Sequence, residues 1–189
     1  DGDGNSSQRR EIYPKYKLNR RQDMNEFKFE SYLIQKQRVK EYLEECFVRQ
    51  IRVDNNESDD LIAYYCQVAK DEDKTVFTAD KDLLQLIDST TSIFSPMVKE
   101  TYKMGDKVSV MGHRVPHQNI LTLKVIMGDK SDNIDGIERL GEKTFLKFFP
   151  EVLDQQVSVD DILSKTNQLL QENENNKSLQ NLVKGKTKD

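Results

Sequence analysis

Residues 126–145 read Ile-Met-Gly-Asp-Lys-Ser-Asp-Asn-Ile-Asp-Gly-Ile-Glu-Arg-Leu-Gly-Glu-Lys-Thr-Phe and combine paired acids, glycines and a lysine within 20 residues. Asp129 and Asp132 close an apolar run, and a glycine-containing hairpin over 136–141 follows. Clustered carboxylates suit hard divalent cations, whereas free N–H groups at a turn before a helix suit phosphate oxygens. The stretch therefore indicates metal binding beside phosphate binding. The simpler alternative is a solvated acidic loop followed by a helix cap.

The stretch resembles the Gly-Asp-x-Ser-Asp-Asn-Ile-Pro-Gly-Val-x-Gly-Ile-Gly-x-Lys-Thr-Ala signature of the 5′ nuclease and flap endonuclease superfamily. That superfamily includes the 5′→3′ exonuclease domains of bacterial DNA polymerases and the phage 5′ exonuclease/ribonuclease H enzymes. Asp135 and Arg139 stand where the family has Pro and the first hairpin Gly. The resemblance covers residues 1–150, with further motifs in the family's order.

Composition bounds the class of protein. The chain has 189 residues, enough for one domain with a real core, and a mean hydropathy of −0.78. It holds no apolar run near the roughly 18 residues that a membrane span requires. Its two cysteines lack metal-ligand spacing. We expect a cytoplasmic chain, without a membrane association, in a bacterial or phage-infected cell.

The net charge of −4 averages over two opposed blocks. Residues 9–40 hold ten Lys/Arg against four Asp/Glu, and residues 54–88 hold ten Asp/Glu against three Lys. A basic block can neutralise backbone phosphates while an acidic block holds the cations that act on them. Two solvated faces are the alternative for either block alone.

The N-terminal segment resembles the family's Phe-Asp-x-x-x-x-x-x-Arg-x-x-x-Tyr-Pro-x-Tyr-Lys-x-Asn-Arg motif. Phage-type spacing places Asp1 at the metal-binding Asp, with Asp3 as a substitute under the polymerase-type spacing. The family's opening strand, with its own metal-binding Asp, would precede Asp1, so we expect a fragment or a partial gene product. The basic residues matched or neighbouring here are Arg9, Arg10, Lys17 and Arg20.

Two further acidic segments match the family. Glu57, Asp59 and Asp60 correspond to its Glu-Ala-Asp-Asp and begin a predicted helix, where capping alone would also explain them. Asp80 and Asp82 follow a predicted parallel strand over 74–79 and match its Ser-x-Asp-Lys-Asp-Leu-x-Gln-Leu.

The remaining periodicity predicts amphipathic helices over 21–52, a strand over 90–94 and an edge strand or hairpin over 102–111. Pro116 is expected to begin a helix that runs to Met127, and another helix is expected over 159–170. Residues 171–189 are polar and predicted to be frayed. His113 and His117 are interpreted as surface or capping residues.

The resemblance implies an α/β fold with a mainly parallel central sheet, a PIN-like 5′ nuclease core over 1–115 and a helical arch at about 15–40. A helix-hairpin-helix DNA clamp is implied within 116–189. It implies two Mg²⁺ or Mn²⁺ ions, and allows a K⁺ ion at the hairpin. The implied ligands are Asp1, Glu57 and Asp59 for one ion and Asp80, Asp82 and Asp132 for the other, with Asp60 and Asp129 in the outer shell.

Lys17 and Arg20 would position the scissile phosphate, and the DNA contacts would also include Arg9, Arg10, Gly136, Gly141, Lys143 and Thr144. The implied activity is 5′→3′ exonuclease and 5′ flap endonuclease cleavage by a monomer in replication or repair. Its substrates would be flapped, nicked or gapped DNA and RNA primers in RNA/DNA hybrids, with replication proteins as further partners. The alternatives are a non-catalytic structure-specific DNA-binding fragment and a PIN-type ribonuclease.

Overall fold

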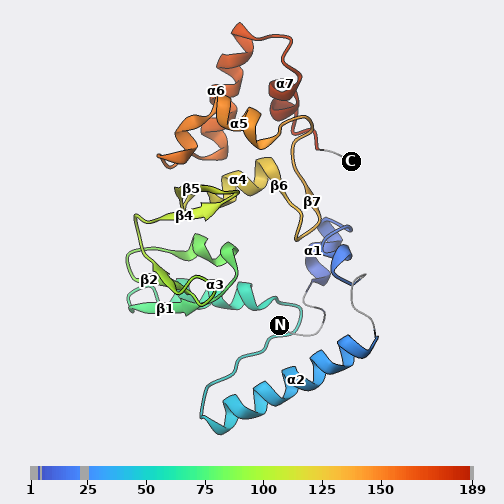
Figure 1. The fold of residues 1–189 in the computed structure, drawn as a ribbon, viewed down its shortest axis with the longest axis vertical. Coiled ribbons are helices and arrows are strands. Elements are labelled where there is room, and N and C mark those ends of the chain that lie inside the picture. Colours follow the sequence, from blue (N-terminus) through green and yellow to red (C-terminus); the bar gives the residue numbers. More distant parts are fainter. Residues whose placement is uncertain (1–3, 5, 22–25, 188–189) are drawn as a thin grey trace. The chain divides into compact units, whose positions relative to one another are not determined.

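The computed structural model describes residues 4, 6–21 and 26–187, which divide into two compact units. The first unit holds residues up to Leu61 together with 131–133, and the second holds 62–130 and 134–189. Figure 1 shows the elements of both along the chain. Asp1 and Asp3 lie outside the described residues, as does the side chain of Arg20.

The first unit is built from α1 (Ser7–Ile12), η1 (Leu18–Arg21), α2 (Glu26–Glu45) and the first turn of α3 (Ser58–Val68). One helix, α2, therefore accounts for most of the region predicted as one or two helices. Charged and apolar residues alternate around it, and its apolar side chains remain exposed, as Phe27 does at 79%.

The main sheet of the second unit has the order β1-β2-β3 and is mixed. Strands β1 (Lys74–Phe77) and β2 (Thr91–Ser95) pair in parallel, whereas β3 (Glu100–Tyr102) pairs with β2 in antiparallel. Both predicted strands are thus present. The expected mainly parallel sheet is represented only by the β1–β2 pair among the described strands.

A hairpin of β4 (Lys107–Val110) and β5 (His113–Pro116) leads into α4 (Asn119–Met127). Pro116 ends a strand instead of beginning the helix, because its partner Lys107 extends the ladder to that position. Strands β6 (Gly128–Asp129) and β7 (Ile134–Asp135) then form a short ladder at the acidic motif. The core of the unit gathers buried side chains from these elements, among them Ile93, Val108, Ile120 and Ile126.

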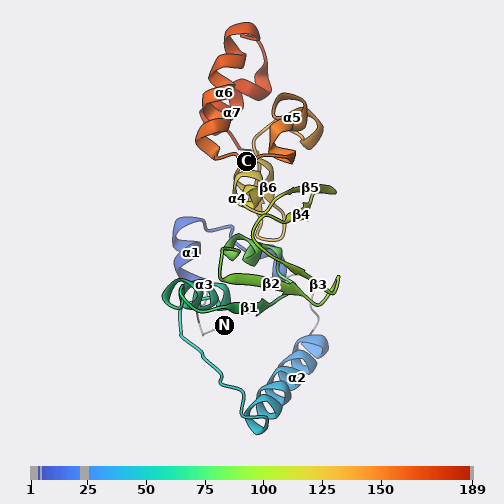
Figure 2. The same cartoon turned by 90° about the vertical axis from the view of Figure 1, so that its left-hand side faces the viewer.

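The C-terminal part contains α5 (Glu142–Phe148), η3 (Pro150–Leu153), α6 (Val159–Glu172) and α7 (Lys177–Lys184). Figure 2 shows α6 and α7 side by side, near α5. The prediction of a frayed segment over 171–189 is wrong for α7. Two of its leucines, Leu179 and Leu182, are buried, although so few apolar residues in a polar stretch give a weak sequence signal.

His117 is another correction, because its side chain is 3% exposed and not on the surface. Within the described residues, neither ring nitrogen has a hydrogen-bond partner. His113 does lie near the surface, where its Nε2 is 2.8 Å from Glu142 Oε1. No helix that the structure describes is long and apolar enough to cross a bilayer.

Candidate active site

Among the described residues of the first unit, Glu57 is the most deeply buried carboxylate, at 4% exposure. Lys17 Nζ donates to it at 2.8 Å, Ser6 Oγ at 3.0 Å and the Tyr16 hydroxyl at 3.2 Å. Burial pushes the pKa of Glu57 up, but the hydrogen bonds from Lys17 and Ser6 outweigh it and leave the pKa below its usual value. The carboxylate is therefore fixed in place and charged.

Asp60 lies in the first turn of α3 and pairs with Arg9 through two hydrogen bonds of 2.7 and 3.0 Å. Its carboxylate also accepts from the Glu57 backbone N–H at 3.1 Å, the geometry of a helix cap. The hydrogen bond from Arg9 lowers the pKa of Asp60. Asp59 lies in the same first turn. Capping thus coexists with the acidic cluster that the sequence predicts.

Residues 131–133, part of the first unit, are hydrogen-bonded to the segment around Lys17. The Lys17 N–H donates to the Asp132 carbonyl at 3.0 Å, and the Asn133 amide donates to the Lys15 carbonyl at 2.8 Å. Lys17 Nζ also lies 3.9 Å from Asp132 Oδ1. Lys17 thus faces two of the predicted carboxylates, Glu57 and Asp132, that are far apart in sequence.

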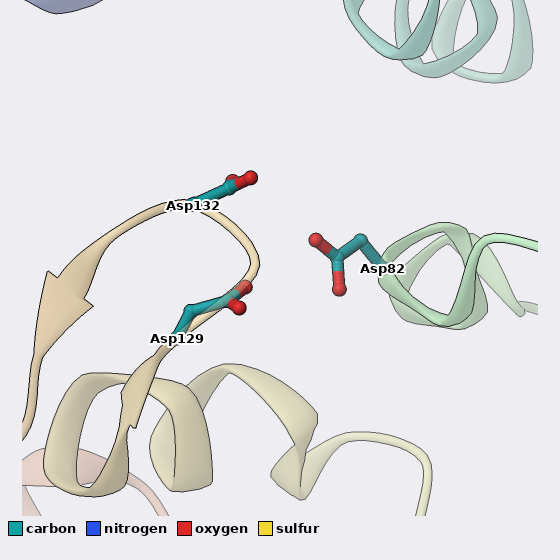
Figure 3. A group of neighbouring side chains, drawn as sticks. All are labelled: Asp82, Asp129 and Asp132. Atoms are coloured by element: carbon teal, nitrogen blue, oxygen red, sulfur yellow. The ribbon is translucent and has the colours of Figure 1, made fainter. Parts of the chain in front are cut away.

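Asp80 and Asp82 lie where β1 gives way to η2 (Lys81–Leu86). The Asp80 carboxylate accepts from the Asp82 N–H at 2.9 Å and so caps η2. Figure 3 shows Asp82 on this element, Asp129 at the end of β6 and Asp132 on the loop that joins β6 to β7. Within the second unit, one oxygen of Asp82 and one of Asp129 lie within 4.8 Å of each other. The structure therefore brings two predicted acidic segments together.

Lys124 was missed by the sequence reasoning. Its Nζ pairs with both Asp82 and Asp129, the latter at 2.5 Å. Burial lowers the pKa of Lys124, but the hydrogen bonds to Asp129 and Asp82 outweigh it and raise the pKa above its usual value. A single charge within the apolar run 119–127, five residues before Asp129, was the available signal.

The donor set suits a hard divalent cation. Carboxylate oxygens are the ligands that Mg²⁺ and Mn²⁺ prefer, and Asp82 and Asp129 offer them within reach of one ion. Asp129 is half-buried and Asp82 more open, so solvent can reach the pair. Lys124 supplies the positive charge that this pair needs in the described structure.

The hairpin after the acidic motif depends on two glycines that pass each other closely. Gly128 has φ +79°, and a Cβ there would collide with the Gly136 nitrogen. A Cβ on Gly136 would collide with the Met127 carbonyl. Beyond them, Gly141 precedes α5, which carries the exposed Lys143 and the half-buried Thr144. Gly128 and Gly136 therefore each require a residue without a side chain.

An α/β fold in which carboxylates gather at the end of β1 and at β6 suits a metal-dependent enzyme acting on phosphate esters. The chain belongs to the 5′-3′ exonuclease family: residues 1–113 match the family described as 5′-3′ exonuclease, N-terminal resolvase-like domain. This confirms the resemblance. The matches favour neither a non-catalytic DNA-binding fragment nor a PIN-type ribonuclease.

Two relatives illustrate the match. A 5′-3′ exonuclease of Mycoplasma pneumoniae is 30% identical over 183 residues, which cover 94% of this chain and 57% of that protein. DNA polymerase I of Lactococcus lactis subsp. cremoris is 31% identical over 154 residues, 78% of this chain and 17% of that protein. The chain thus spans only part of the length of these relatives.

Solved structures of a bacteriophage T5 enzyme share the fold. The T5 5′-exonuclease with bound divalent metal ions (zinc) aligns with a TM-score of 0.74 and 26% identity, covering 97% of this chain and 67% of that chain. A T5 flap endonuclease complex with DNA and metal ions aligns with a TM-score of 0.72 and 26% identity, covering 97% and 66%.

Proposed function

We propose that this chain is a divalent-metal-dependent 5′ nuclease that hydrolyses phosphodiesters of 5′-flapped, nicked or gapped DNA and of RNA primers. The family membership supports the reaction class. The observation that carries the metal dependence is the pairing of carboxylates from separate segments, Asp82 with Asp129, and the charged, buried Glu57. Lys17 and Lys124 offset part of the charge of these carboxylates, and divalent cations would offset the rest.

The proposed ligands are those that the resemblance implies. Asp1, Glu57 and Asp59 would hold one Mg²⁺ or Mn²⁺, and Asp80, Asp82 and Asp132 the other, with Asp60 and Asp129 in the outer shell. The Asp129 oxygen within 4.8 Å of an Asp82 oxygen supports a place for Asp129 beside the second ion as well. Bound divalent ions would supply an activated water and would stabilise the leaving oxygen. Glu57 is suited to this role because Lys17, Ser6 and Tyr16 already fix its position.

Lys17 is the proposed phosphate-positioning residue, with Arg20 three residues after it in the sequence. The pKa of Lys17 is lowered by burial but raised more by hydrogen bonds to Glu57 and Tyr16, so it is above its usual value. The ammonium therefore keeps its charge at neutral pH and can attract a phosphate oxygen. Arg9 pairs with Asp60, and Arg10 donates to the Tyr16 carbonyl at 3.1 Å, so both also order this segment.

The proposed DNA grip is the helix-hairpin-helix formed by α4, the hairpin and α5, with contacts from Gly136, Gly141, Lys143 and Thr144. Such a grip contacts the sugar-phosphate backbone without reading bases. A K⁺ ion at the hairpin, which the resemblance allows, is also part of the proposal. The proposal also includes a nuclease core over 1–115 with an arch at about 15–40. It further includes a monomeric state, replication proteins as partners and a cytoplasmic setting.

The test is cleavage of a 5′-labelled flap duplex with and without Mg²⁺. We expect Mg²⁺-dependent cutting near the junction that Asp82→Ala and Asp132→Ala each reduce by at least about a hundredfold. Asp71→Ala removes an exposed acid of the turn after α3 and is the matched control. Binding of the duplex without cleavage by the unaltered chain would contradict the nuclease proposal.

A further inference from the structure

Helix α7 is hydrogen-bonded to the hairpin over 136–141, which follows β7. Ser178 Oγ donates to the Arg139 carbonyl at 2.7 Å, and Asn181 Nδ2 donates to the Glu138 carbonyl at 3.0 Å. Both acceptors belong to the two residues at the tip of the hairpin. One face of α7 therefore lies directly against that tip.

The chain beyond α7 adds a second set of contacts. The Glu138 N–H donates to the Lys186 carbonyl at 2.8 Å, and Ile137 forms an antiparallel bridge with Thr187. Lys186 Nζ lies 2.7 Å from Glu138 Oε2, and this ammonium lowers the pKa of Glu138. The one acid at the tip is thereby paired with a cation, which reduces its repulsion of a phosphate.

The helix is anchored independently of these contacts. Leu179 and Leu182 are buried in the core, and the Asn176 side chain caps the helix by accepting from two backbone N–H groups. Gly185 ends it in the left-handed conformation, with φ +60°. The placement of α7 against the hairpin is therefore a feature of the packed unit.

The basic residues of α7 lie beside this contact face. Lys177, Asn181 and Lys184 follow the i, i+4, i+7 spacing and so share one stripe of the helix. Since Asn181 reaches the hairpin, Lys177 and Lys184 flank the point of contact along the helix. Both lysines are exposed. Residues 177–187 carry three Lys and no acid, whereas residues 159–176 carry four acids and one Lys.

We infer that α7 and the hairpin form one surface for the phosphate backbone of a duplex. Lys177 and Lys184 are its additional contact residues, and Ser178 and Asn181 are positioning residues. The inference rests on the proposed function, because it extends the hairpin grip proposed above. A pair of exposed ammonium groups on a rigid helix neutralises phosphates without reading sequence.

The experiment measures binding of a fluorescent 5′-flap duplex by anisotropy over a series of KCl concentrations, with a chelator to prevent cleavage. We expect Lys177→Gln/Lys184→Gln to weaken binding by about tenfold and to reduce the slope of log K against log[salt] by about 2. The control Lys70→Gln/Lys103→Gln removes the same charge from the turn after α3 and the end of β3. It should change neither quantity by as much.

Two further comparisons distinguish residues that contact the DNA from residues that only position α7. Asn181→Ala should weaken binding while leaving the contact lysines, and hence most of the salt slope, intact. If Lys177→Gln/Lys184→Gln keeps the affinity and salt slope of the unaltered chain while Lys143→Gln weakens binding, the inference about α7 is overturned and the hairpin grip stands. If the unaltered chain neither binds nor, with Mg²⁺, cleaves the duplex, the proposed function fails and this inference fails with it.

Discussion

Lys17 Nζ lies 2.8 Å from Glu57 Oε2, and the two side chains are 12% and 5% exposed. A buried carboxylate that loses its cation keeps the cost of desolvation without the compensating attraction. We expect Lys17→Gln to lower the free energy of unfolding by about 2 kcal/mol in urea, measured without divalent ions. Lys15→Gln, which removes an exposed lysine nearby, should have an effect within about 0.5 kcal/mol. Equal stability of the two variants would contradict the role assigned to this pair.

Lys124 leads to a prediction about metal affinity. Its ammonium neutralises both Asp82 and Asp129, so a divalent ion must compete with it for their oxygens. We expect Lys124→Met to bind Mn²⁺ about five- to tenfold more tightly, since each tenfold step corresponds to about 1.4 kcal/mol. Isothermal titration calorimetry measures this directly.

The matched control for that experiment is Lys81→Met. Lys81 neighbours Asp82 in sequence, but its Nζ donates to the Ser109 carbonyl. The Lys81→Met substitution removes the same charge as Lys124→Met but leaves the ion pairs of Lys124 with Asp82 and Asp129 in place. Mn²⁺ affinities that rise equally in both variants would show that net charge alone, and not competition by Lys124, governs metal binding.

The acidic segments could be recognised because they match family motifs residue by residue, whereas their composition alone also fits helix caps. The resemblance assigns Asp82 and Asp129 to one metal-binding region, and the structure brings those two side chains together. Lys124 was not predictable with the same ease, because its partners lie 42 residues before it and five after it. A long-range ion pair leaves no periodic trace in the sequence.

In the fold, too, some elements could be predicted from the sequence and others could not. Strands β1 and β2 follow from β-branched and aromatic runs, which favour strands even though β1 is only partly buried. Helix α7 was missed because only two of its residues, Leu179 and Leu182, pack into the core, and a polar sequence with caps resembles a frayed tail. Its stability comes from tertiary packing instead of composition.

His117 gives a pH prediction. Burial lowers its pKa below the usual value of about 6.5, although Asp106 opposes the shift. A histidine that is kept neutral in the fold binds its proton more readily when unfolded, so stability is lost as the pH falls below about 6.5. The slope cannot exceed about 1.4 kcal/mol per pH unit for one group.

Urea unfolding between pH 5 and pH 8 measures that slope. We expect His117→Leu to reduce the dependence of stability on pH, because the variant has no buried ring to titrate. Leucine should be tolerated at this site, since neither ring nitrogen of His117 has a hydrogen-bond partner among the described residues. His113→Gln removes the half-exposed histidine and should leave most of the slope in place. An unchanged slope in His117→Leu would show that other groups cause the acid sensitivity.

Arg139 supplies the last prediction, which concerns the tip of the hairpin. It adopts φ +63°, in the left-handed region that costs a residue with a side chain about 1 kcal/mol. Its carbonyl accepts a hydrogen bond from Ser178, and its guanidinium lies 3.5 Å from the Glu138 carboxylate. We expect Arg139→Gly to raise the free energy of unfolding by about 0.5–1 kcal/mol, whereas Arg139→Ala keeps the strain and should lower it slightly. Urea unfolding at neutral pH distinguishes them, and an alanine variant as stable as the glycine variant would show that the tip relaxes out of the left-handed conformation.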